Sequence, residues 1–170
     1  MAQLLINMLL TRKKEIHEKW VNLIFDDYQS EGAKFFREHK DPFINPVGGI
    51  ISKDTMVLYD QLLGTMDTAA INQSLDNIIK IRAIQELSPV EAVAFLYQLK
   101  EVIIGELDDG DFVKATTADL IEIFDRIDRL TKIAFEIYMN NREKINQIRI
   151  HEMKKRFALI DINKVPKAKN

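Results

Sequence analysis

Three histidines are the residues of this sequence best suited to acid–base or metal chemistry, and their spacing fits neither. His17, His39 and His151 stand far apart, and none belongs to a Glu-x-x-His, His-x-x-x-His or His-Glu-x-x-His pattern that places two ligands on one helix face. The chain has no cysteine, so thiolate metal sites and cysteine nucleophiles are excluded. We predict no metal site and no cofactor. We expect His17 and His151 to be solvated and His39 to be structural or exposed.

The densest group of carboxylates does not have the spacing of a cation site. The segment ELDDGDF holds Glu106, Asp108, Asp109 and Asp111 around Gly110, but an EF-hand loop needs acids at alternate positions and a glutamate at position twelve. We interpret this segment as a turn that ends a helix. The chain also lacks a GxSxG elbow, a Walker loop and a GxGxxG turn. The sequence therefore predicts no catalytic residue and a protein that is not an enzyme.

Charge is distributed unevenly along the 170 residues, although the net charge is only −2. Residues 142–170 contain nine Lys or Arg and three acids, a net charge of +6, which leaves −8 for residues 1–141. An acidic body repels nucleic acid. The opening MAQLLINMLL is followed, not preceded, by basic residues, unlike a secretory signal, and no apolar run approaches the roughly 18–20 residues that span a bilayer. We expect a cytoplasmic protein with no nucleic-acid partner and no membrane insertion.

The elements that position these residues are predicted to be helices, because the chain has six Gly, four Pro and long stretches without either. The Ser88-Pro89-Val90-Glu91 run fits a capping box with proline at the first helical position. The expected helices cover residues 3–27, 30–38, about 47–63, about 68–87, 89–107 and about 116–165. The last one would be roughly 68 Å long. The predicted fold class is all-α.

The long last helix carries an apolar heptad seam that predicts self-association. The seam residues singled out are Ile127, Ala134, Tyr138, Asn141, Ile145 and Ile148. A polar residue in such a seam can set the register of a dimer, and one domain is too small to cover the whole helix. We therefore predict a symmetric homodimer, the commonest closed assembly. The alternative is that the residues after about 150 fold back, fray or dock on another protein. The predicted units are a domain over 1–141, a helical extension over 142–163 and a basic tail over 164–170.

One stretch of the chain has the marks of a known family. They are Asn45-Pro46-Val47-Gly48 entering a helix, the run Ile79-Lys80-Ile81-Arg82-Ala83 with Gln85, the Ser88-Pro89-x-x-Ala92 cap, and Phe95 through Leu99-Lys100. Over roughly residues 10–145 the chain resembles the RsbRD-type N-terminal domain of the RsbT co-antagonist protein family. The resemblance implies a globin-like, all-helical sensor domain that holds no haem and feeds an output domain through a long helix. A plain up-down helical bundle is the alternative fold.

The sequence itself also argues against haem, because no histidine lies between His39 and His151 to serve as an axial ligand. Only KVPKAKN follows the long helix, so we expect no output domain after it. The expected function is a non-enzymatic sensor that acts through a protein partner of a signalling pathway or a small apolar ligand. A haem- or metal-binding redox protein and a pure protein–protein adaptor are the alternatives.

If a ligand exists, the resemblance directs attention to a small set of residues as a candidate pocket. They are Asn45, Pro46, Gly48, Arg82, Gln85 and Phe95. Arg82 stands in an otherwise apolar stretch, and a buried guanidinium needs a partner. That partner is either a neighbouring acid or helix-end carbonyl, which would make Arg82 structural, or the ligand itself.

Overall fold

The computed structural model of the chain describes residues 3–28, 30–39, 41, 43–85, 87–107 and 116–164. These residues form seven helices and no strand. The helices are α1 (Gln3–Thr11), α2 (Lys13–Asp26), α3 (Ser30–Glu38), α4 (Pro46–Leu63), α5 (Thr68–Ile84), α6 (Pro89–Glu106) and α8 (Thr117–Lys164). The all-α class and the long C-terminal helix that the sequence predicted are both confirmed.

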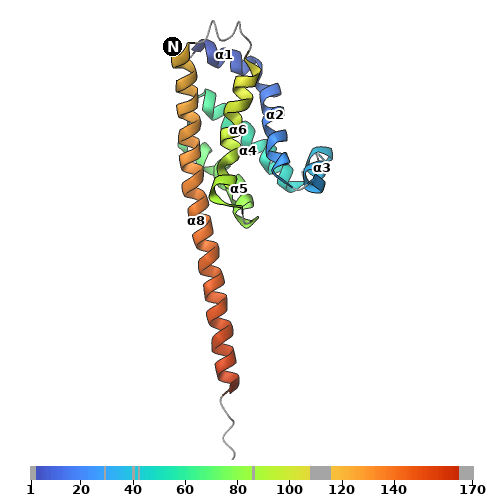
Figure 1. Ribbon diagram of the computed structural model, residues 1–170, viewed down its shortest axis with the longest axis vertical. Helices are drawn as coiled ribbons and strands as arrows, with labels where there is room; N and C mark the ends of the chain where they lie inside the picture. The colour runs from blue at the N-terminus through green and yellow to red at the C-terminus, as the bar shows by residue number, and fades with distance from the viewer. Residues whose placement is uncertain are drawn as a thin grey trace, which may run out of the picture.

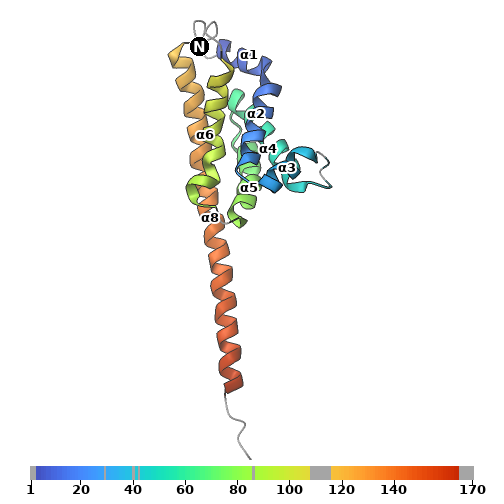
Figure 2. The same ribbon diagram turned by 45° about the vertical axis from the view of Figure 1, so that its right-hand side comes forward.

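The shorter helices gather around the first half of α8 (Figures 1 and 2). The main packing pairs are α4 with α5, α2 with α6, and both α5 and α6 with α8. The short α3 lies at the side of the molecule, against α2 and α4. A single apolar core lies between these helices and includes Trp20, Leu58, Ile78, Phe95 and Ile127. The Trp20 ring stacks near the Phe95 ring, with centroids 6.2 Å apart, and its Nε1 donates to the Phe95 carbonyl at 2.6 Å.

Side-chain caps define where three of the helices begin. The Asn45 side chain accepts from the Gly48 amide, and Asp67 does the same for Ala69 at the start of α5. At α6 the predicted capping box is present: the Ser88 hydroxyl accepts from the Glu91 amide, and the Glu91 carboxylate accepts from the Ser88 amide. Each cap satisfies backbone donors that the first turn of a helix leaves unpaired.

The first predicted helix, residues 3–27, is interrupted at Arg12 and forms two helices. Arg12 has φ −97° and ψ 11°, outside helical geometry, although its carbonyl still accepts from the Ile16 amide. The Arg12 guanidinium donates to the Glu106 carbonyl at the end of α6. The bend lets Leu5 and Ile16, on successive helices, both pack into the core, and a straight helix cannot wrap a small core in this way.

The helix α8 has 48 residues and is about 72 Å long at 1.5 Å per residue. Its first half packs on the domain, and Asn141 is its last buried side chain. The second half stands clear of every other helix in both views (Figures 1 and 2), and all described side chains from 146 to 158 are exposed. Residues 165–170, most of the predicted basic tail, lie outside the described part of the chain. None of the described helices has the length and apolar character needed to cross a membrane.

Candidate functional site

The candidate pocket residues lie at two separate places. Asn45 and Gly48 are buried beside a groove between α2, α3 and α4, whereas Arg82 and Phe95 contact each other between α5 and α6. The remaining two, Pro46 and Gln85, are exposed. The fold therefore does not bring the six residues together into one pocket.

The hydrogen-bonding groups of the Asn45 side chain are occupied by the backbone. Its Oδ1 accepts from the Gly48 amide at 2.8 Å, and its Nδ2 donates to the carbonyls of His39 at 2.9 Å and Phe36 at 3.2 Å. A Cβ atom on Gly48 would lie 2.8 Å from Cγ and Oδ1 of Asn45, so glycine is needed for this cap to form. Asn45 and Gly48 hold the end of α3 against the start of α4.

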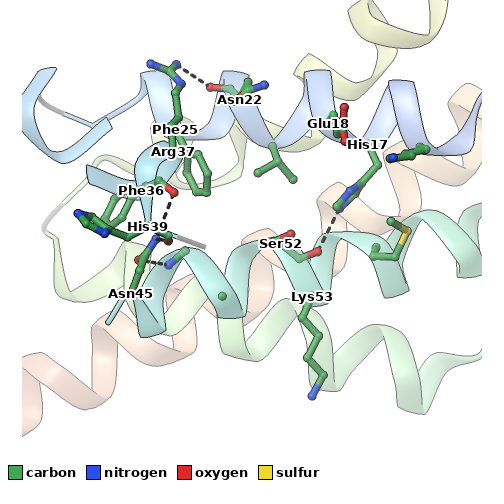
Figure 3. Close-up of a pocket in the computed structure, with 15 residues that line it drawn as sticks. His17, Glu18, Asn22, Phe25, Phe36, Arg37, His39, Asn45, Ser52 and Lys53 are labelled. Atoms are coloured by element: carbon green, nitrogen blue, oxygen red, sulfur yellow. Dashed lines mark hydrogen bonds between the residues drawn. The ribbon is translucent and has the colours of Figure 1, made fainter. Parts of the chain in front are cut away.

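The groove beside this cap, the α2/α3/α4 groove, has a volume of about 750 Å³. Its apolar wall is formed by Val21, Phe25, Phe36 and Met56. His17 on α2 and Ser52 on α4 lie next to each other across it, and the Lys53 side chain extends from α4 away from α2 (Figure 3). The volume is within the range of small-molecule sites, about 300–1,000 Å³.

His17 is buried, contrary to the expectation from sequence. Only 6% of it is exposed, and its Nε2 lies 3.1 Å from the Ser52 carbonyl oxygen and 2.9 Å from Thr55 Oγ1. Burial lowers the pKa of His17, with Lys13 acting in the same direction, so the imidazole is neutral at pH 7. Its spacing from Val21 and Ile24 places all three on one helix face, which is the signal that sequence reasoning missed. His39 and His151 are exposed.

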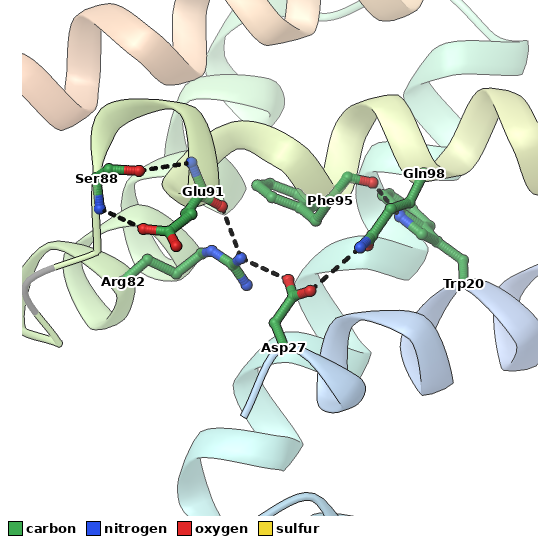
Figure 4. A network of polar contacts seen from close by, with 7 residues as sticks. All are labelled: Trp20, Asp27, Arg82, Ser88, Glu91, Phe95 and Gln98. Atoms are coloured by element: carbon green, nitrogen blue, oxygen red, sulfur yellow. Dashed lines mark hydrogen bonds and ion pairs between the residues drawn. The ribbon is translucent and has the colours of Figure 1, made fainter. Parts of the chain in front are cut away.

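Arg82 is the centre of a buried polar network (Figure 4). It is 1% exposed, and its Nη2 donates to Asp27 Oδ2 at 2.7 Å and to the Glu91 carbonyl at 2.9 Å. Its guanidinium carbon lies 5.5 Å from the centre of the Phe95 ring, and Gln98 donates to the other oxygen of Asp27 at 3.2 Å. An acid at the end of α2 and a carbonyl in the first turn of α6 therefore pair with Nη2 of Arg82, which joins α2, α5 and α6. The buried Nε and Nη1 of Arg82 have no hydrogen-bond partner among the described residues.

A second groove, the α6/α8 groove, has a volume of about 730 Å³. It is lined by Val90, Val93 and Tyr97 of α6 and by Asp128, Thr131, Lys132 and Phe135 of α8, among others. Lys100 also lines it, and its Nζ pairs with Asp128 Oδ1 at 2.6 Å. Tyr97 and Phe135 are half-exposed here.

The residues predicted to form a dimer seam are mostly part of the chain's own core. Ile127, Ala134, Tyr138 and Asn141 are buried within the domain, Ile145 is partly buried, and Ile148 is exposed. The Tyr138 hydroxyl donates to the Leu87 carbonyl. A second copy would therefore meet other side chains of α8. Dimerisation itself stays a prediction.

Metal and acidic sites receive no support from the described residues. No three His, Asp or Glu side chains among them are grouped closely enough to hold a metal ion. Of the acidic ELDDGDF segment, residues 108–112 lie outside the described part of the chain.

Comparison with known proteins supports the resemblance found from sequence. No curated protein and no solved structure matches the chain. The family model of the RsbT co-antagonist protein rsbRD N-terminal domain matches residues 14–153, which covers the helices from α2 through most of α8. This family is a family of regulatory domains in stress signalling. The chain belongs to the RsbT co-antagonist protein rsbRD N-terminal domain family.

Proposed function

We propose that this chain is a non-enzymatic, cytoplasmic sensor domain of globin-like fold, that it works as a symmetric dimer, and that α8 carries its state to a protein partner. Family membership supports the signalling role. The observation that carries the proposed dimer is an exposed apolar surface on α6 and α8, described next.

The apolar stripe, as we call this surface, begins on α6. Val90, Tyr97 and Ile104 are spaced by seven residues, so they share one helix face, and between 46% and 75% of each is exposed. The neighbouring face of α8 adds Phe135 and Met139, both half-exposed. Monomeric soluble proteins rarely expose a contiguous apolar patch of this kind unless a partner covers it.

The apolar stripe continues along the free half of α8. Ile150, Met153 and Phe157 are exposed. At 100° per residue, each lies within about 40° of the mean direction of Phe135 and Met139 around the helix axis. A twofold axis parallel to α8 would bring two such stripes together over both halves of the helix. A second copy is the occupant we propose, because an isologous contact covers the same surface on both chains.

The test is the solution mass by light scattering of three versions of the full chain. Wild type is expected to be a dimer, and the double variant Phe135→Ser, Met139→Ser is expected to be a monomer. Phe43→Ser is the matched control, because Phe43 is 97% exposed and lies outside the stripe. A monomeric wild type, or a double variant that remains a dimer, would refute the dimer. A Soret absorption band in the purified protein would favour the haem alternative instead.

A further inference from the structure

The helix α8 carries a second heptad pattern, on its exposed side, where it leaves the domain. The core positions of this exposed seam alternate in steps of four and three residues, and they are Met139, Glu143, Asn146, Ile150, Met153 and Phe157. All six side chains are exposed in the single chain. At 100° per residue, the exposed seam lies about 130° around the helix from the seam that packs on the domain. A repeat of this kind is the pattern by which two helices wrap around each other in a coiled coil.

Asn146 stands in the middle of the exposed seam, between apolar positions on both sides. Its side-chain amide is exposed and makes no hydrogen bond with another described residue. An amide carries both donors and an acceptor, so two identical amides related by a twofold axis can pair with each other. A continuous apolar groove of a different protein would bury this amide unpaired, which is unfavourable. The chemistry of the seam therefore selects a second copy of this chain as its occupant.

We propose that two copies of α8 form a parallel, in-register coiled coil beyond the domain, in which the Asn146 amides pair across the twofold axis. Ile150, Met153 and Phe157, which are half-exposed or more in the single chain, then pack against the same residues of the second copy. A polar residue at a core position fixes the register of a coiled coil at a cost in stability. Asn146 is therefore the residue that determines the specificity of pairing. This inference rests on the dimer proposed above and adds how its two long helices are aligned.

Like charges beside the exposed seam keep this coiled coil weak. Residues 142–164 contain seven Lys or Arg and three acids, so two parallel copies repel each other. Salt screens this repulsion, and the pairing of the two helices is expected to strengthen as the ionic strength rises. Docking of an acidic protein on the same basic helix would show the opposite dependence on salt.

Single cysteines test the alignment, because the chain has none of its own. In the full chain, Ile150→Cys and Met153→Cys are each expected to form a disulfide with the same position of the second copy under mild oxidation, because equal core positions lie opposite each other in a parallel, in-register coiled coil. The yield is expected to rise between about 0.05 M and about 0.5 M NaCl. Lys155→Cys is the matched control, because it lies on the opposite side of α8 and is expected to remain unlinked.

Two changes at Asn146 test the amide pair, and both alter a side chain that is exposed in the single chain, so the domain keeps its fold. Asn146→Leu removes the polar core position and is expected to lower the dissociation constant of the dimer, measured by analytical ultracentrifugation, by about 5-fold or more. Asn146→Asp places two like charges together and is expected to raise this constant by about 10-fold or more. Asn140→Asp adds the same charge about 120° around the helix from Asn146 and is expected to leave it unchanged.

The coiled coil is overturned if Ile150→Cys and Met153→Cys link no faster than Lys155→Cys, if their yield falls as salt is added, or if Asn146→Asp behaves like Asn140→Asp. The mass of wild type by light scattering separates this outcome from the dimer. A dimer without these crosslinks holds through the domain alone, and only the coiled coil is then overturned. A monomeric wild type overturns the dimer and the coiled coil together.

Discussion

Replacing Arg82 by alanine tests whether the buried network holds the fold or serves a ligand. The substitution leaves Asp27 without its cation and the Glu91 carbonyl without a side-chain donor. Removing one member of a buried ion pair costs about 3–5 kcal/mol. The Asp27 side chain is 26% exposed and can be rehydrated, so the cost is expected at the lower end, about 3 kcal/mol.

Urea denaturation followed by circular dichroism measures this cost. With an m-value of about 2 kcal/mol/M, a loss of about 3 kcal/mol lowers the midpoint by about 1.5 M. Lys80→Ala is the matched control, because Lys80 pairs with Asp76 on the surface of the same helix, and exposed pairs contribute about 0–1 kcal/mol.

A double-mutant cycle tests whether the stability lost in Arg82→Ala comes from the broken ion pair with Asp27. Asp27→Asn combined with Arg82→Ala is expected to cost clearly less than the sum of the two single changes, because each single change already breaks the pair. The reasoning is refuted if Arg82→Ala loses less than about 1 kcal/mol at an unchanged m-value. Arg82 would then be free to act on a ligand or partner.

Three further predictions concern caps and the buried histidine. Gly48→Ala is expected to lower stability by about 1–2 kcal/mol, because its Cβ meets the capping side chain, whereas Gly105→Ala, with open space around it, is expected to raise the melting temperature. Ser88→Ala removes one half of a capping box and is expected to cost about 1 kcal/mol in urea denaturation. The pKa of His17 is lowered by burial, with Lys13 lowering it further and Glu18, Asp60 and the Ser52 carbonyl raising it. The unfolded chain therefore binds more protons than the folded chain just below pH 6.5, and stability is expected to fall as the pH drops from 6.5 towards the folded pKa. Thermal melts between pH 7.5 and 5 should show a smaller fall for His17→Phe, and equal slopes would contradict this pKa shift.

Helix boundaries were predictable from sequence wherever local chemistry determines them. The Ser88 cap, the Asn45 entry and the Leu63 end of α4 depend on residues a few positions apart. The bend at Arg12 was not predictable, because its cause includes a carbonyl at Glu106, 94 residues away in sequence. Local patterns do not reveal which distant backbone group a side chain will reach.

The candidate site was predictable only in part, for a related reason. The burial of Arg82 followed from its apolar neighbours, but its partner Asp27 is 55 residues away. The charged surroundings of His17 in sequence concealed the helix face that it shares with Val21 and Ile24. In α8, four of the six seam residues are buried within the domain. A single sequence cannot distinguish a seam that packs on its own domain from one that packs on a second copy.

The exposed C-terminal half of α8 is expected to unfold locally more easily than the half that packs on the domain. Helical stability in proteins comes mainly from packing of one face, and the described side chains beyond Ile145 have no such packing within one chain. Amide exchange along α8 is therefore expected to change from the slow rates of global unfolding to the fast rates of fraying over a few turns. Any surface that binds the free half slows exchange there, so protection along this one helix reports whether the domain is bound.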